Sequence, residues 1–212
     1  MIKKHRLETY WELDMTKIKL CGNFRVEDAE LLNVAKPDMA GMIFAPNHRR
    51  TVNIGTAIKI RDRLDDSIPL VGVFMDQPVA DIMTIYQSGM IQVVQLHGSE
   101  TEFDVEILQE NNIPVIQVHQ PDNFLKPTAA DYVLLDAGAG SGQTFDWGMV
   151  PPKPLRQQPL MLAGGLTVNN LQQSINKVHP DFVDISSGDE VDGIKNIEKM
   201  QALVAIAHAN LE

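Results

Sequence analysis

Short apolar runs alternate with longer amphipathic segments along most of the chain, and this alternation sets the expected fold. Six segments with helical spacing of apolar residues lie at residues 26–35, 53–64, 79–87, 102–110, 168–178 and 197–209. Eight runs rich in apolar residues read as strands, at residues 18–21, 39–45, 70–75, 91–96, 115–118, 132–136, 160–163 and 182–186. Such strands, joined mostly by helices, are typical of parallel strands buried on both faces. The interval 120–131 carries two prolines, so we expect only a loop or a short helix there.

Repeated strand–helix units fit either a closed barrel or an open, doubly wound sheet. A barrel places its site at the carboxyl ends of strands all around the ring, whereas an open sheet gathers it near one switch point. Polar and glycine residues end predicted strands along the whole chain: Cys21, Asn47 to Arg50, Asp76, His97, Asp136, Gly164 and Ser186. We therefore expect an α/β fold made of a single (β/α)8 TIM barrel, with an N-terminal leader at residues 1–16 and the catalytic domain at residues 17–212.

Composition narrows the classes of protein and partner. The chain has 212 residues, 44% of them hydrophobic, which suits one sizeable core. Its net charge of -10 disfavours nucleic acids and anionic membranes, which require clustered Lys and Arg. No apolar run approaches the roughly 20 residues of a membrane span, and the single cysteine is compatible with a reducing compartment. We expect a cytoplasmic protein that binds small molecules, as a monomer or a homodimer.

The one cysteine, Cys21, closes the first predicted strand two residues after Lys19. Positions two apart in a strand face the same side, so both side chains are expected inside the barrel. A neighbouring ammonium lowers the pKa of a thiol from its ordinary value of about 8.5, which would equip Cys21 as a proton-abstracting base. A lone cysteine is also often a small buried hydrophobe. The strand end, followed by Gly22, favours the catalytic interpretation.

An aspartate, Asp136, closes the sixth predicted strand before a glycine-rich loop. Partial burial would favour the neutral form of its carboxyl group, which suits a general acid near neutral pH. A helix-capping or turn carboxylate is the alternative. Asp146, beside Trp147, is interpreted as an N-cap rather than a catalyst.

Glycine and serine motifs end the last strands, where barrels often bind phosphate through backbone amides and the N-terminus of a short extra helix. The sixth loop can add a further amide. The candidate phosphate-binding residues are Gly140, Ser141, Gly142, Gly164, Gly165, Ser186, Ser187 and Gly188.

Basic and histidine residues end two earlier strands. Arg49 and Arg50 carry guanidinium groups that can clamp a carboxylate with two parallel hydrogen bonds, although a solvated basic turn is equally typical. His97 faces the site if Gln95 does, as a positioning or substrate-binding group. No His, Cys and carboxylate cluster has the spacing of a zinc site, so no metal is expected.

Taken together, these motifs resemble one family closely, phosphoribosylanthranilate isomerase, an enzyme of tryptophan biosynthesis. The resemblance spans residues 17–205 and rests on the order and spacing of short motifs. Those motifs include Lys19-Leu20-Cys21-Gly22, Val94-Gln95-Leu96-His97-Gly98, Leu135-Asp136, Leu162-Ala163-Gly164-Gly165-Leu166 and Val183-Asp184-Ile185-Ser186-Ser187-Gly188.

The resemblance implies a reaction and a role for each site residue. The reaction is the Amadori rearrangement of N-(5-phosphoribosyl)anthranilate to 1-(2-carboxyphenylamino)-1-deoxyribulose 5-phosphate. It implies that Cys21 is the general base, Asp136 the general acid and Arg50 the anchor of the anthranilate carboxylate. It also implies that Asp184 contacts the anthranilate amine and that the glycines of the last loops hold the phosphate. No cofactor is implied, because the imine nitrogen acts as the electron sink.

Several positions depart from the family's usual pattern. Asn23-Phe24 stands where an aliphatic residue and Thr are usual, and His48-Arg49-Arg50 stands for Ser-Pro-Arg. The alternatives are another phosphosugar isomerase or epimerase, and a barrel that binds a phosphosugar without turnover. Asn23-Phe24 alone favours a barrel without turnover, and a histidine-pathway isomerase would need an aspartate at Cys21.

Overall fold

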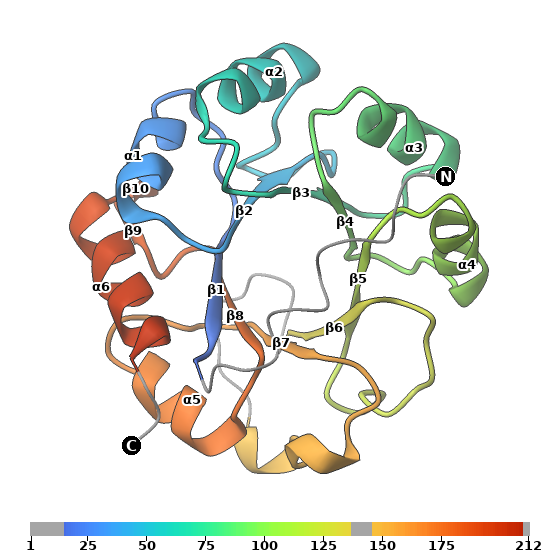
Figure 1. Cartoon of the computed structure of the whole chain (residues 1–212), viewed down its shortest axis with the longest axis vertical. Helices are drawn as coiled ribbons and strands as arrows, with labels where there is room; N and C mark the ends of the chain where they lie inside the picture. The colour runs from blue at the N-terminus through green and yellow to red at the C-terminus, as the bar shows by residue number, and fades with distance from the viewer. Residues whose placement is uncertain (1–14, 137–145, 210–212) are drawn as a thin grey trace.

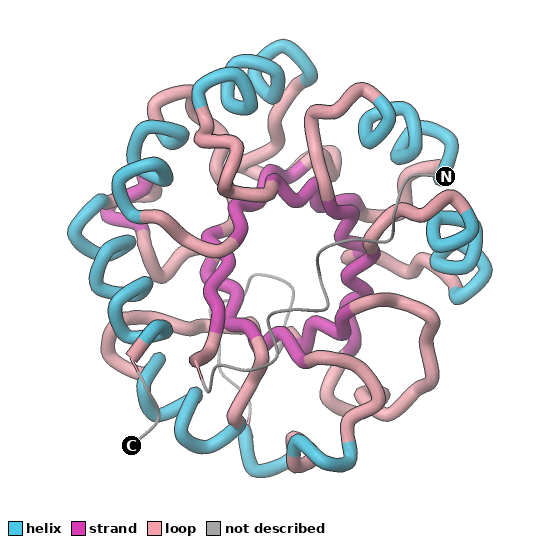
Figure 2. Tube along the Cα trace, in the orientation of Figure 1, coloured by secondary structure: helices cyan, strands magenta, loops and turns pink. Residues whose placement is uncertain are grey.

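Eight parallel strands close into a barrel in the computed structural model, which describes residues 15–136 and 146–209. The ring is visible in Figure 2, and it closes where the first strand pairs with the last, Leu20 lying beside Ile185. The strands are β1 (Lys17–Leu20), β2 (Met39–Ile43), β3 (Leu70–Phe74), β4 (Val93–Leu96), β5 (Val115–His119), β6 (Tyr132–Leu135), β7 (Leu160–Leu162) and β8 (Phe182–Ile185). The expected closed barrel is confirmed.

Helices surround the barrel on its outer side (Figure 1). They are α1 (Asp28–Ala35), α2 (Ile54–Arg63), α3 (Val79–Gln87), α4 (Glu102–Glu110), α5 (Leu171–Val178) and α6 (Ile197–His208). No helix joins β5 to β6: the interval 120–131, for which the two prolines predicted a loop or a short helix, is a loop. The described part of the β6–β7 connection holds two short 3-10 helices, η1 (Trp147–Met149) and η2 (Lys153–Leu155).

Local sequence signals set several helix ends. Asn53 and Asn196 cap α2 and α6, their side chains accepting hydrogen bonds from Thr56 N and Lys199 N. Asp146 accepts a hydrogen bond from Gly148 N at the start of η1, so its prediction as an N-cap is confirmed. Helix α5 begins three residues later than predicted, at Leu171, because residues 167–170 form a turn instead.

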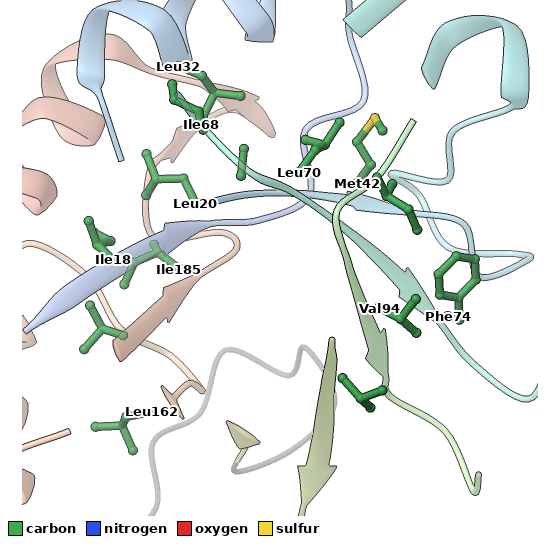
Figure 3. Close-up of a cluster of buried hydrophobic side chains, with 14 of the residues drawn as sticks. Ile18, Leu20, Leu32, Met42, Ile68, Leu70, Phe74, Val94, Leu162 and Ile185 are labelled. Atoms are coloured by element: carbon green, nitrogen blue, oxygen red, sulfur yellow. The ribbon is translucent and has the colours of Figure 1, made fainter. Parts of the chain in front are cut away.

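Successive side chains of the strands point alternately into two separate apolar cores, one outside the barrel and one inside it, as β1 illustrates. Ile18 and Leu20 point outward into the apolar layer between barrel and helices, part of which Figure 3 shows. A second cluster fills the barrel interior and includes Met39, Val71, Ile116, Leu134 and Met161. Because neighbours in a strand face opposite sides, Lys19 and Cys21 face inward.

A small hairpin, which the sequence analysis did not predict, follows β8. It consists of β9 (Glu190–Val191) and β10 (Ile194–Lys195), joined by Asp192 and Gly193. Both turn residues have positive φ, 50° and 79°. Asp-Gly between apolar residues is a strong signal for such a two-residue turn, so this element was recognisable.

None of the described helices combines the length and the apolar character that crossing a membrane requires. Residues 1–14 of the predicted leader and residues 210–212 lie outside the described residues.

Candidate active site

A cavity of about 250 Å³ opens at the carboxyl ends of the strands. Residues from β1, β2, β3, β4, β6, β7 and β8, or from the loops directly after them, line it. Most of the predicted site residues whose positions are described are among them: Cys21, Arg50, His97, Asp136, Gly164, Gly165, Asp184, Ser186 and Ser187.

Cys21 lies one residue beyond β1 on the inward face, and its side chain is almost fully buried. Lys19 lies on the same face, where its ammonium forms an ion pair of 2.8 Å with Asp184 Oδ1. Gly41, on the neighbouring strand, makes room for the thiol, since a Cβ at this position would lie 2.7 Å from Cys21 Sγ. The neighbouring strands β1 and β8 thus bring a thiol, an ammonium and its partner carboxylate together.

Burial raises the pKa of the Cys21 thiol, because the thiolate loses its hydration inside the barrel. The ammonium of Lys19 opposes this change but does not outweigh it, and the carboxylate of Asp184 adds to the increase. Lys19 thus acts on the pKa of Cys21 in the expected direction, but the expected net shift of that pKa towards neutrality is wrong. The same contacts with Asp184 and Cys21 raise the pKa of Lys19 despite its own burial.

Asp136 lies one residue beyond β6, and 6% of it is exposed. His97 Nε2 is 3.4 Å from Asp136 Oδ2, while Nδ1 of the same ring is 3.0 Å from Gln95 Nε2. With Gln95 Nε2 donating to Nδ1, a neutral His97 ring carries its proton on Nε2, which faces the carboxylate. Gln95 thereby sets the tautomer with which His97 meets Asp136.

The second-strand loop supplies one arginine to the cavity. Arg50 is 4% exposed and lines the cavity, and its Nη1 donates to the carbonyl of Ser186 at 2.6 Å. Gly22 lies against this guanidinium, because a Cβ there would be 2.7 Å from Nη1. Arg49 is not among the lining residues and half of its side chain is exposed. Of the two candidates, Arg50 is therefore the one placed to meet a ligand.

The predicted phosphate-binding residues divide into three groups. Gly164, Gly165, Ser186 and Ser187 line the cavity after β7 and β8, both glycines with positive φ. Gly188 does not line it and packs instead against the loop after β7, where a Cβ would lie 2.0 Å from the carbonyl oxygen of Leu166. The expected short helix is absent after β8, since residues 186–189 form a turn leading into the hairpin.

The third group lies outside the described residues, at Gly140, Ser141 and Gly142.

Sequence reasoning missed the buried charges that the hairpin carries. Lys195 has a fully buried side chain, and its Nζ donates to the carbonyls of Cys21 (2.6 Å) and Ser186 (2.8 Å) and to Asp189 Oδ1 (2.8 Å). Lys195 therefore links the residues that directly follow β1 and β8 through its side chain. Glu190, directly opposite Lys195 in the hairpin, pairs with Arg49 and Arg50. The Asp192-Gly193 dipeptide could have predicted the hairpin and therefore that Glu190 and Lys195 lie opposite each other.

The unusual Asn23-Phe24 pair has a packing role. Asn23 is fully buried and its Nδ2 donates to the carbonyls of Leu20 (2.8 Å) and Gly41 (3.0 Å), which ties β1 to β2. Phe24 packs against the outer core. Neither side chain lines the cavity, so this pair gives no support to a barrel without turnover.

Within residues 15–136 and 146–209, no three His, Cys, Asp or Glu side chains are grouped to hold a metal ion.

Residues 18–206 match the model of the family described as N-(5'phosphoribosyl)anthranilate (PRA) isomerase. The chain belongs to this family. It is 43% identical over 196 residues to the N-(5'-phosphoribosyl)anthranilate isomerase of Lactiplantibacillus plantarum, an alignment that covers 92% of this chain and 93% of the relative. Membership makes the chain an isomerase of tryptophan biosynthesis, as the sequence motifs indicated.

Two solved structures of the family are closely similar to this chain. The phosphoribosyl anthranilate isomerase from Thermus thermophilus superposes with a TM-score of 0.80 at 31% identity, covering 90% of this chain and 98% of that one. A second family member superposes with a TM-score of 0.78 at 28% identity, covering 91% and 98%. That protein was crystallised with reduced 1-(o-carboxyphenylamino)-1-deoxyribulose 5-phosphate.

Proposed function

We propose that this chain converts N-(5-phosphoribosyl)anthranilate to 1-(2-carboxyphenylamino)-1-deoxyribulose 5-phosphate by an Amadori rearrangement, with Cys21 and Asp136 as its two proton-transfer groups. The observation that carries the proposal is that a thiol and a carboxyl group from β1 and β6 line one cavity together with a buried arginine. The reaction of this substrate requires three groups: a general base, a general acid and a cation that binds the anthranilate carboxylate.

Asp136, as a carboxylic acid, donates its proton to the ring oxygen, so the furanose opens and the anomeric carbon becomes a protonated imine. Cys21, as a thiolate, removes the proton from sugar C2, and the electron pair of that C–H bond moves towards the imine nitrogen. The resulting enolamine moves its hydroxyl proton to C1 through solvent and becomes the ketone. Asp136 then regains a proton and Cys21 loses one to water, which restores the enzyme. General acid and base steps each contribute about 10²- to 10⁴-fold to the rate.

The remaining residues orient the substrate. Arg50 binds the anthranilate carboxylate through its guanidinium, Asp184 accepts a hydrogen bond from the anthranilate amine, and His97 aligns Asp136. Backbone amides at Gly164, Gly165, Ser186 and Ser187 hold the phosphate. Gly140, Ser141 and Gly142 remain predicted phosphate-binding residues, and Gly188 supports the turn after β8 by packing against the carbonyl of Leu166.

The proposed setting is a cytoplasmic enzyme with one catalytic domain at residues 17–212, acting on a small phosphosugar. The net charge of -10 supports the exclusion of nucleic acid as a partner. Arg50 lines the cavity, and Arg49 and Arg50 together face the single carboxylate of Glu190, so this side of the site is suited to an anionic ligand.

Genetic rescue and product identification test the proposal. A tryptophan auxotroph that lacks this isomerase should grow without tryptophan when it expresses the chain, and should not grow when it expresses Cys21→Ser. The purified chain should yield a product of unchanged mass with a ketone at C2. A wild-type chain that is soluble and folded, yet neither rescues growth nor forms this ketone, would contradict the proposal.

A further inference from the structure

Two adjacent arginines converge on one carboxylate beside the cavity. Arg50 Nη1 is 2.8 Å from Glu190 Oε1, and Arg49 Nη2 pairs with Glu190 Oε2. Glu190 and Arg50 each have only 5% of their side chains exposed, whereas half of Arg49 is exposed. The Arg50–Glu190 pair is thus shielded from solvent, and its charge-assisted hydrogen bond fixes the orientation of the Arg50 guanidinium.

The contacts of Arg50 leave one edge of its guanidinium for a ligand. Nη1 is occupied, since it donates to both Glu190 and the Ser186 carbonyl. Nε is buried without a hydrogen-bond partner in the described part of the chain, and there Nη2 has none either. The edge formed by Nε and Nη2 matches the two oxygens of a carboxylate. A buried charged donor without a partner is costly, so this edge is built to be filled by a ligand.

Glu190 is itself fixed by the hairpin. Its backbone carbonyl accepts a hydrogen bond from Lys199 Nζ at 2.7 Å, and Lys195 lies opposite it in the ladder with Nζ 3.8 Å from Oε1. Lys195 also holds the ends of β1 and β8 through the carbonyls of Cys21 and Ser186. The Glu190 carboxylate is therefore a rigid support, which fixes how the Arg50 guanidinium is turned.

Arg49 offsets the negative charge that Glu190 places beside Arg50. A single Arg50–Glu190 pair carries no net charge and would attract an anion only weakly. With Arg49 on the second oxygen, two cations face one carboxylate, and the net charge of the three groups is +1. The neighbouring Lys195–Asp189 pair adds nothing to this sum when both are charged.

We propose that Glu190 is a positioning residue that presents the Nε–Nη2 edge of Arg50 to the substrate's aromatic carboxylate, and so determines selectivity for a carboxylated ring. This inference rests on the proposed function, in which Arg50 reads that carboxylate. Glu190 acts only through Arg50 and touches no reacting atom.

The test uses two ligands on the full chain: a reduced analogue of the product with its carboxyphenyl ring, and the same molecule with a plain phenyl ring. Calorimetry gives Kd for each. Glu190→Ala should raise the Kd of the carboxyphenyl ligand about tenfold and leave that of the phenyl ligand within about threefold, since one oriented charge-assisted pair is lost. Glu190→Gln, which keeps the shape and one acceptor oxygen, should fall between wild type and Glu190→Ala.

Glu106→Ala serves as the matched control, because Glu106 is exposed on α4. It should leave both Kd values unchanged. Thermal unfolding confirms that each variant is folded at the temperature of the titration. A Glu190 variant that is folded and weakens the two ligands equally, or weakens neither, overturns the inference.

Arg50→Ala separates this inference from the proposed function. If Arg50→Ala abolishes the preference for the carboxyphenyl ligand while both Glu190 variants retain it, the inference is wrong and the role of Arg50 stands. If Arg50→Ala itself retains the preference, the carboxylate is read elsewhere and both fail. Where both hold, adding Glu190→Ala to Arg50→Ala should change the preference no further.

Discussion

Cys21 and Asp136 each occupy the first position after a buried strand, and this position determines their chemistry. Their backbones are held by the sheet while their side chains reach the cavity. The period of two along β1 was enough to predict that Lys19 and Cys21 share a face. It could not predict the pKa of the thiol, because the balance between burial and the Lys19 ammonium depends on distances that only the closed barrel sets.

Alkylation of Cys21 tests that balance. Cys21 is the only cysteine of the chain, so uptake of iodoacetamide measured by mass spectrometry reports this one thiol. Only the thiolate reacts, and a raised pKa lowers its fraction at neutral pH. The rate should still be rising at about pH 9, above the ordinary pKa of about 8.5. A plateau below about pH 8 would show instead that Lys19 dominates.

Asp136→Asn tests the acid. The amide keeps the shape of the side chain but cannot donate a carboxylic proton, so kcat should fall by about 10²-fold or more. The Kd of the reduced product analogue should change little, because Asp136 is assigned no binding role. A higher KM at constant kcat would make Asp136 a binding residue instead.

The strands position the site, but loops and the β9–β10 hairpin supply several of the charged groups around it. Apolar runs predicted all eight strands, because a buried parallel strand leaves a clear apolar signature. The β9–β10 hairpin escaped prediction because its strands have two residues each, too short for any periodicity. Its Asp192-Gly193 turn was the local signal that indicated a hairpin. Without the hairpin, the sequence gives no reason to pair Asp189 and Glu190 with Lys195 and the arginines.

Gly188 tests how tightly the last two loops pack. An alanine Cβ there would lie 2.0 Å from the backbone carbonyl of Leu166, which cannot rotate away. Gly188→Ala should lower the free energy of unfolding by about 1 to 3 kcal/mol or more, as overpacking does. In helix α2, Gly55→Ala is the matched control and should be neutral or stabilising by up to about 1 kcal/mol. Urea unfolding curves compare the two; equal stability would refute this packing.

Asp189 predicts a pH dependence of stability. Burial raises its pKa from 3.8 to about 6, although Lys195 opposes the change. A raised folded-state pKa means that this group favours folding most at low pH, and that the contribution disappears as pH rises through about 6. Relative to Asp189→Asn, wild type should lose about 1 to 2 kcal/mol between pH 5 and pH 7.5. A difference that is constant with pH would contradict this.

Closure of the barrel brings together parts of the site that are remote in sequence. The Lys19–Asp184 pair joins residues 165 positions apart, and the Lys195–Cys21 hydrogen bond joins residues 174 apart. Motif order predicted that these segments meet at one end of the barrel. The contacts themselves could not be predicted, since small shifts of the β1–β8 register would exchange their partners. Closure also brings three buried cations, each paired with a carboxylate, to this end of the barrel: Lys19, Arg50 and Lys195.

The most direct test of the account follows the fluorescence of freshly prepared phosphoribosylanthranilate as purified protein consumes it. Wild type should accelerate its disappearance with kcat/KM in the range of about 10⁴ to 10⁸ M⁻¹s⁻¹. Cys21→Ser should retain the thermal stability and the Kd for the reduced product analogue while kcat falls about 10²-fold or more, because an alcohol is a far weaker base than a thiolate. Consumption by wild type no faster than the spontaneous decay, or near-normal kcat in Cys21→Ser, would contradict the account.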